Sequence, residues 1–142
     1  MWRIHFPYCG SNNYNGFCYL STNKVNWYDG VDFCKRNGGE ILSLKTDAEE
    51  KFVTDLFPDK VPFWIGYHGH RHSGYQFVWS DGSDGSYSRM DPRSLSMGMS
   101  GGLCAVVDKT EWKRRKCNKL AYAICKVPGK SVGSCVMRNA NA

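Results

Sequence analysis

The chain has 142 residues, of which 42% are hydrophobic and 14% aromatic, and its formal net charge is +6. This length and composition exclude a disordered chain and fit one globular domain that can bury a sizeable core. The apolar runs span only a few residues, so we expect no membrane insertion. Residues 1–7 lack the apolar stretch of a signal peptide, which predicts a mature form or an excised piece of an exported protein.

Seven cysteines indicate an oxidising compartment, and therefore a secreted protein or the extracellular part of a surface protein. The spacings between neighbouring cysteines are too long for a zinc knuckle, so disulfides are the better interpretation. An odd count leaves one cysteine over. Cys135, in the tail, is the candidate for a bond to a partner chain; a free thiol or a bond within a longer precursor stays open.

Residues 9–20 are predicted to form a hairpin, because aromatic residues flank Asn15-Gly16, which favours a tight turn. Residues 26–37 predict a helix that Asn26 caps, with Asp29 three residues further on and glycines at its end. One face of this helix is expected to carry Trp27, Val31 and Cys34.

A short apolar strand is expected at residues 41–44, followed by a second helix that starts at Thr46 and ends before Pro58. Thr46 and Glu49 match the capping box, in which each side chain accepts from the other's backbone amide. The buried stripe of this helix is expected to be Phe52, Val53 and Leu56.

The second half of the chain predicts strands around one long loop. The strands are expected at residues 63–65, 76–79, 103–107 and 121–125. Residues 80–102, rich in glycine and serine, predict an irregular loop, and a loop of that length is usually functional or mobile. Helices followed by strands indicate an α+β fold.

Several of these residues recur in a family order. They are Cys9, Cys18, Trp27, Cys34, Gly38-Gly39, Trp64-Ile65-Gly66, Trp79-Ser80-Asp81-Gly82-Ser83, Cys104, Trp112, Cys117 and Cys125. In this order the chain resembles a C-type-lectin-like domain from about Cys9 to Val127. The resemblance implies a C-type-lectin-like α+β fold over residues 9–128, with an N-terminal extension at 1–8 and a flexible tail at 129–142. It also implies three disulfides: Cys9–Cys18, Cys34–Cys125 and Cys104–Cys117.

The chain departs from the calcium-dependent members of this family, which bind sugar through a metal in the long loop. Lys113 and Arg114 follow Trp112 where those members have asparagine and aspartate, so two oxygen ligands are replaced by two cations. The loop offers Asp91-Pro92-Arg93 in place of the family's metal-binding triplets. Asp81, Asp84 and Asp91 are interpreted as turn residues, and we expect no metal and no cofactor.

Charge is concentrated near the last cysteines. This basic run has six cations and one acid, Glu111; its cations are Lys109, Lys113, Arg114, Arg115, Lys116 and Lys119. With Arg93 they are the candidate ligand-binding residues, and a solvated face is the alternative. We expect replacement of Lys113, Arg114 and Arg115 by serine to leave the melting temperature nearly unchanged, and Trp112 to be a packed anchor.

Three functions stay open, and none of them is enzymatic, because no recognised pairing of nucleophile and base occurs. The first is a calcium-independent recognition module that binds a protein. The second is a binder of sulfated or other anionic glycans through the basic run. The third is a secreted, toxin-like subunit linked through Cys135. His68, His70 and His72 alternate as strand residues could, but three such histidines rarely complete a metal site. No nucleic-acid partner is expected.

Overall fold

The computed structural model describes residues 10–57, 61–70, 76–95 and 102–129. Its helical elements are η1 (Gly10–Asn12), α1 (Trp27–Arg36), α2 (Asp47–Leu56) and α3 (Pro92–Leu95). Its strands are β1 (Asn13–Tyr14), β2 (Phe17–Val25), β3 (Glu40–Ile41), β4 (Phe63–His70), β5 (Gln76–Trp79), β6 (Cys104–Asp108), β7 (Glu111–Arg115) and β8 (Ala121–Pro128). The fold is α+β, as the sequence predicts. No helix within these ranges is both long enough and apolar enough to cross a membrane.

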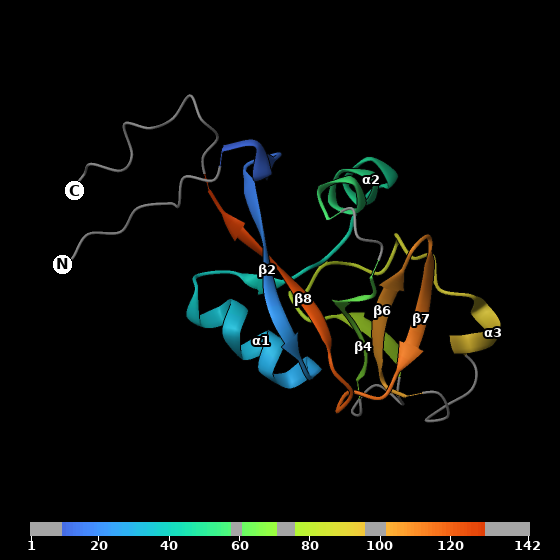
Figure 1. Ribbon diagram of the computed structural model, residues 1–142. Coiled ribbons are helices and arrows are strands. Elements are labelled where there is room, and N and C mark those ends of the chain that lie inside the picture. The colour runs from blue at the N-terminus through green and yellow to red at the C-terminus, as the bar shows by residue number, and fades with distance from the viewer. Residues whose placement is uncertain (1–9, 58–60, 71–75, 96–101, 130–142) are drawn as a thin grey trace.

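The strands of the described residues form one sheet with the order β1-β2-β8-β4-β6-β7, and β3 and β5 pair with β8 and β4 respectively. All pairings are antiparallel except that between β4 and β8. Figure 1 shows α1 beside the long β2 and β8 strands, and β6 and β7 at the far end of the sheet beside α3. The loop and the basic run therefore meet at the β7 edge.

The core has two parts, one on each face of the sheet, because side chains alternate along a strand. Along β4, Phe63 and Ile65 belong to one buried cluster and Trp64 belongs to the other. The Trp64 cluster is covered by Trp27 of α1. The opposite cluster includes Val53 of α2. The two helices thus cover different faces of the sheet.

The predicted hairpin and first helix are confirmed. Asn15 and Gly16 both have positive φ, 56° and 88°, as a tight hairpin turn requires. The Asn26 side chain accepts a hydrogen bond of 2.9 Å from the backbone N–H of Asp29 and so caps α1. Gly30 packs this helix against β8, since a Cβ there would lie 2.9 Å from the Cβ of Ala123.

The second helix begins as predicted, but its buried side differs. Thr46 accepts from the backbone N–H of Glu49, whereas the Glu49 carboxylate accepts from Lys45 and not from Thr46. The predicted bond from the Thr46 side chain is confirmed, and the predicted return bond from Thr46 N–H to the Glu49 carboxylate is wrong. Val53 is buried, but the expected Phe52 and Leu56 are only half-buried. The other buried positions are Glu49 and Glu50, each 4% exposed, because tertiary partners satisfy their charges.

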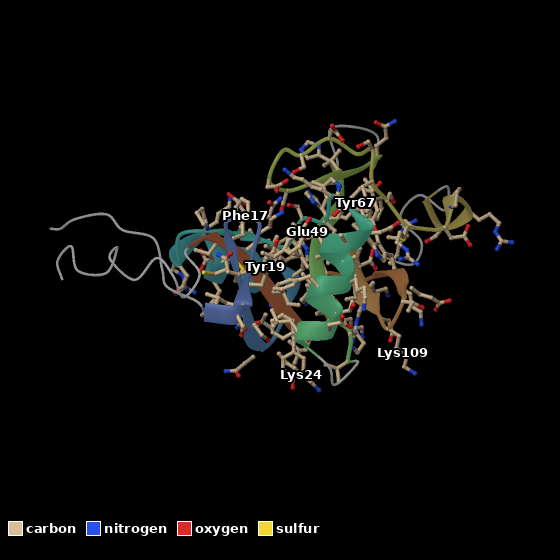
Figure 2. All side chains as sticks on the ribbon, turned by 90° about the horizontal axis from the view of Figure 1, so that it is seen from above. Phe17, Tyr19, Lys24, Glu49, Tyr67 and Lys109 are labelled. Atoms are coloured by element: carbon tan, nitrogen blue, oxygen red, sulfur yellow. A yellow bond between two sulfur atoms is a disulfide. The ribbon has the colours of Figure 1, made fainter. Side chains whose placement is uncertain are left out.

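Glu49 belongs to a buried ion pair between α2 and the central strand β8. Its Oε2 lies 2.6 Å from the Lys126 Nζ and accepts a 2.6 Å hydrogen bond from the Tyr19 hydroxyl. Lys126 also donates to the backbone carbonyl of Ser43. Burial, with the hydrogen bond to Glu49, raises the pKa of Tyr19 well above its usual range, so this hydroxyl stays a donor. Figure 2 shows Glu49, on α2, close to Tyr19.

Two disulfides brace the ends of the fold. Cys34–Cys125 joins α1 to β8 across a sequence separation of 91, and Cys104–Cys117 joins β6 to the segment after β7. These are two of the three pairings that the resemblance implies. Cys18 is also disulfide-bonded. Its expected partner, Cys9, lies outside the described residues, as does Cys135.

Three strand and loop assignments differ from the sequence predictions. The strand expected at 41–44 is reduced to β3, although Leu42 and Leu44 are fully buried beside it. The long loop contains the single helical turn α3. The sequence analysis also missed β7, because its charged residues lack the usual apolar alternation of a strand. An edge strand tolerates such charges, and β6 supplies its hydrogen-bonding partner.

Candidate functional site

A groove of about 530 Å³ lies between the middle of the long loop, residues 89–94, and strand β7. We call it the loop groove; it is lined by Arg89, Asp91, Ser94, Thr110, Glu111, Trp112, Lys113 and Arg114. A bridge between Met90 and Trp112 brings loop and strand together. Two of the candidate residues, Lys113 and Arg114, therefore line one concave surface, and Arg93 lies in the chain between the lining residues Asp91 and Ser94.

Because it forms part of a strand, the basic run is divided between two faces of the sheet. Trp112 and Arg114 lie on the face of α2 and the long loop, where Trp112 packs against Trp79 and Tyr87. Lys113 and Arg115 lie on the opposite face, and the Arg115 guanidinium is 5.8 Å from the centre of the Trp64 ring. The cations are thus not a single patch.

The Arg114 side chain contacts backbone groups of its own chain. Its guanidinium donates to the backbone carbonyls of Ser94, at 2.6 Å, and Gly102, at 2.7 Å, and lies over the ring of Phe77. Ser94 and Gly102 stand on either side of residues 96–101, so a single cation joins both ends of that segment. Burial lowers the pKa of Arg114 somewhat, but a guanidinium remains charged.

The other cations of β7 also have partners within the protein. Lys113 pairs with Asp108 at 3.2 Å and Glu111 at 3.6 Å, and Arg115 donates to the carbonyl of Leu120. The structure therefore corrects the expectation for the triple serine variant. Loss of the Arg114 and Arg115 contacts removes hydrogen bonds that hold the fold, so its melting temperature should fall.

A buried carboxylate, that of Glu50, holds both walls of the loop groove. It accepts hydrogen bonds from the Tyr87 hydroxyl at 2.7 Å and from the Trp112 indole at 3.0 Å, and Arg89 lies 3.7 Å away. Asp47, one turn earlier on α2, accepts from the same Tyr87 hydroxyl. Sequence analysis missed Glu50, because a glutamate in a helix ordinarily indicates a solvated face.

Trp112 is 4% exposed, which confirms the prediction of a packed anchor. Its indole N–H is engaged by Glu50 and its ring by the aromatic cluster of Tyr67, Trp79 and Tyr87. The ring is therefore not available for stacking against a ligand.

The three loop aspartates accept hydrogen bonds from residues two positions further on. Asp81 accepts from the backbone N–H of Ser83, Asp84 from Ser86, and Asp91 from Arg93. The Arg93 side chain also pairs with Asp91, and this hydrogen bond lowers the pKa of Asp91. Among the described residues, no group of three histidine, cysteine or acidic side chains is placed to hold a metal.

The remaining candidates lie away from the loop groove or outside the described residues. Lys109 occupies the exposed turn between β6 and β7, visible in Figure 2. Lys116 and Lys119 are exposed in the turn before β8. His68 and His70 share one face of β4, and the His68 ring lies tilted against Trp27 with centroids 4.8 Å apart, while His72 lies outside the described residues.

Comparisons with known proteins agree with this architecture. Residues 23–127 match the model of the lectin C-type domain. Human lymphocyte antigen 75 is 35% identical over 111 residues, which are 76% of this chain and 6% of that protein. Human lithostathine-1-beta is 32% identical over 133 residues, 87% of this chain and 79% of that protein. The structure of human lithostathine superposes with a TM-score of 0.73 at 26% identity, covering 83% of this chain and 96% of the other.

Proposed function

The chain belongs to the lectin C-type domain family, and on that premise we propose that it is an extracellular recognition module that binds a protein ligand without calcium. The binding surface in this proposal is the loop groove. The chain spans only 6% of the length of lymphocyte antigen 75. The proposal therefore concerns the binding activity of this domain and not the activity of a longer protein. The disulfides Cys34–Cys125 and Cys104–Cys117 support an oxidising, extracellular setting.

The observation that carries calcium independence is the position of Arg114. A metal ion can organise a loop by drawing backbone and side-chain oxygens around a positive charge. Here the Arg114 guanidinium draws in the carbonyls of Ser94 and Gly102. Because this cation is covalently part of the chain, it can hold Ser94 and Gly102 together without an added ion, which supports the proposal.

The mixed charge of the loop groove favours a protein over a neutral sugar. Its lining includes the acids Asp91 and Glu111 and the bases Arg89 and Lys113. Such a pattern can complement a protein surface that carries both signs. Without a metal, a sugar ring commonly packs on an exposed aromatic face, and the groove's own Trp112 is buried. Recognition without catalysis is part of the same proposal.

Millimolar calcium is expected to leave thermal stability unchanged. A ligand that binds only the folded state at a hundredfold excess over its dissociation constant would raise stability by about 2.7 kcal/mol. Melting curves measured with calcium and with chelator should therefore coincide. A rise in melting temperature that chelator reverses would contradict calcium independence and direct attention to Asp81, Asp84 and Asp91.

Binding should depend on the exposed charges of the loop groove. A panel of extracellular protein domains, screened in the presence of chelator, is expected to contain a ligand whose affinity falls about tenfold or more on Lys113→Glu. Lys35→Glu, an exposed charge reversal on α1, is the matched control and should bind as the parent does. Equal binding by both variants would place the ligand elsewhere. Binding that chelator abolishes would refute the proposal.

Secretion as a subunit linked through Cys135 is the remaining alternative. Mass mapping of the unreduced protein decides it, since it identifies whether Cys135 is joined to a second chain.

A further inference from the structure

A second concave surface lies on another part of the molecule, along the Cys104–Cys117 disulfide. It consists of two grooves, of about 330 Å³ and 310 Å³, which share Tyr28, Leu103 and Cys117. We call it the disulfide groove; its other lining residues are Trp27, His68, Gly69, His70, Gly102, Cys104, Lys116 and Asn118. None of the loop aspartates and none of the β7 side chains contributes to it.

Tyr28 gives this surface an exposed aromatic face. It is 63% exposed, although it is a large ring at the start of α1. The Tyr28 and Trp27 rings meet edge to face with centroids 5.5 Å apart, and the Trp27 ring lies tilted against that of His68 at 4.8 Å. The buried Trp27 also donates its indole N–H to the carbonyl of Ile65, so the row of rings has a fixed base. A ring supported in this way costs little entropy when a ligand packs on it.

The charge of the disulfide groove differs in kind from that of the loop groove. No carboxylate is among the described residues that line it. Lys116 is exposed, and within the described ranges it makes no ion pair, whereas Lys113 and Arg114 are held by oxygens of the protein. The carboxylate that follows Tyr28, Asp29, accepts from the Asn26 side chain at the start of α1. An unneutralised lysine in a groove without acids favours an anionic ligand.

His68 adds a polar group with a defined role. Its Nδ1 lies 3.0 Å from the carbonyl of Gly66, and since a carbonyl only accepts, this nitrogen carries the proton. Burial lowers the pKa of His68, so the ring is neutral near pH 7 and its second nitrogen is an acceptor. An acceptor of this kind suits the hydroxyl groups of a sugar.

We propose that the disulfide groove binds a sulfated polysaccharide, with a sugar ring packed on Tyr28 and a sulfate group paired with Lys116. Leu103 is the one aliphatic side chain in the described lining, so the surface lacks the deep apolar pocket in which a peptide would anchor. This site is separate from the loop groove and does not depend on the protein ligand proposed there. It also gives a role to Lys116, a cation of the basic run that lies outside β7.

Heparin, as the sulfated probe, tests the proposal by titration of the full chain at low salt. Tyr28→Ala and Lys116→Ser are each expected to weaken binding about tenfold, the loss of one charge-assisted or stacking contact. Lys116→Ser should also reduce the dependence of affinity on salt. Lys113→Ser and Lys35→Ser remove one charge each elsewhere and should bind within about twofold of the parent. Melting curves of all four variants should match the parent, because these side chains are exposed.

Two further probes separate the sources of negative charge. An unsulfated glycan of the same backbone should not bind, and polyglutamate should bind weakly and without dependence on Tyr28. An equal loss of heparin affinity in Lys116→Ser and Lys35→Ser would overturn the proposal. Absence of heparin binding by the parent would also overturn it. Polyglutamate binding as tight as heparin and equally sensitive to Tyr28→Ala would overturn it in favour of an acidic peptide. Protein binding in the loop groove is measured separately with Lys113→Glu, so either proposal can fail alone.

Discussion

Lys126→Met is expected to lower the free energy of unfolding by about 3–5 kcal/mol, because it leaves the buried Glu49 carboxylate without its compensating charge. The Lys126 ammonium lies 2.6 Å from Glu49 and also donates to the Ser43 carbonyl. Methionine keeps the unbranched shape and most of the length of the side chain, and it removes only the ammonium, which also lies 4.9 Å from the centre of the Phe17 ring. The loss therefore measures the charge and not a cavity. Chemical denaturation of parent and variant gives this difference directly.

An exposed pair provides the matched control. Lys51 and Asp55 lie 2.8 Å apart on the outer side of α2, with side chains 77% and 58% exposed. Lys51→Met should cost less than about 1 kcal/mol, since water already screens that pair. Replacing the buried group as a set, with Lys126→Met, Glu49→Leu and Tyr19→Phe, should recover most of the lost stability. A Lys126→Met variant no less stable than Lys51→Met would show that Glu49 is solvated.

Glu50→Ala is expected to cost about 2–4 kcal/mol and to weaken binding in the loop groove. The substitution leaves two donors, the Trp112 indole and the Tyr87 hydroxyl, without their common acceptor, and each unsatisfied buried group costs about 1–3 kcal/mol. Tyr87 retains Asp47 as a partner, which limits its share. Because Trp112 and Arg89 line the groove, their release should also increase hydrogen exchange in residues 89–94 and in β7.

Two variants test whether the effect of Glu50→Ala comes from the loss of its hydrogen bonds to the groove wall. Asp47→Ala removes a carboxylate that accepts from the same hydroxyl, but an exposed one, so the cost should stay below about 1 kcal/mol. Glu50→Gln keeps one acceptor oxygen and should fall between parent and alanine. Unchanged hydrogen exchange at residues 89–94 in Glu50→Ala would mean that other contacts fix the groove wall.

The sequence alone determined the local elements whose signals are contained within a few residues. Asn15-Gly16 specified the first hairpin, and Asn26 and Thr46 specified where α1 and α2 begin, because turns and caps depend on groups close together in the chain. The ordered cysteines and tryptophans identified the family through resemblance, and with it the pairings of Cys34 and Cys104.

Only the tertiary structure decided what each charged residue does. Glu49 and Glu50 look like surface residues of a helix, yet Lys126 and Trp112 reach them from 62 or more positions away in the chain. Arg114 and Lys116 are near neighbours in one basic run, but the first binds loop carbonyls and the second faces solvent beside Tyr28. The reason is physical: whether a charge stabilises the fold or meets a ligand depends on its burial and its partners, and those are set by strand pairing and helix packing that local sequence does not contain.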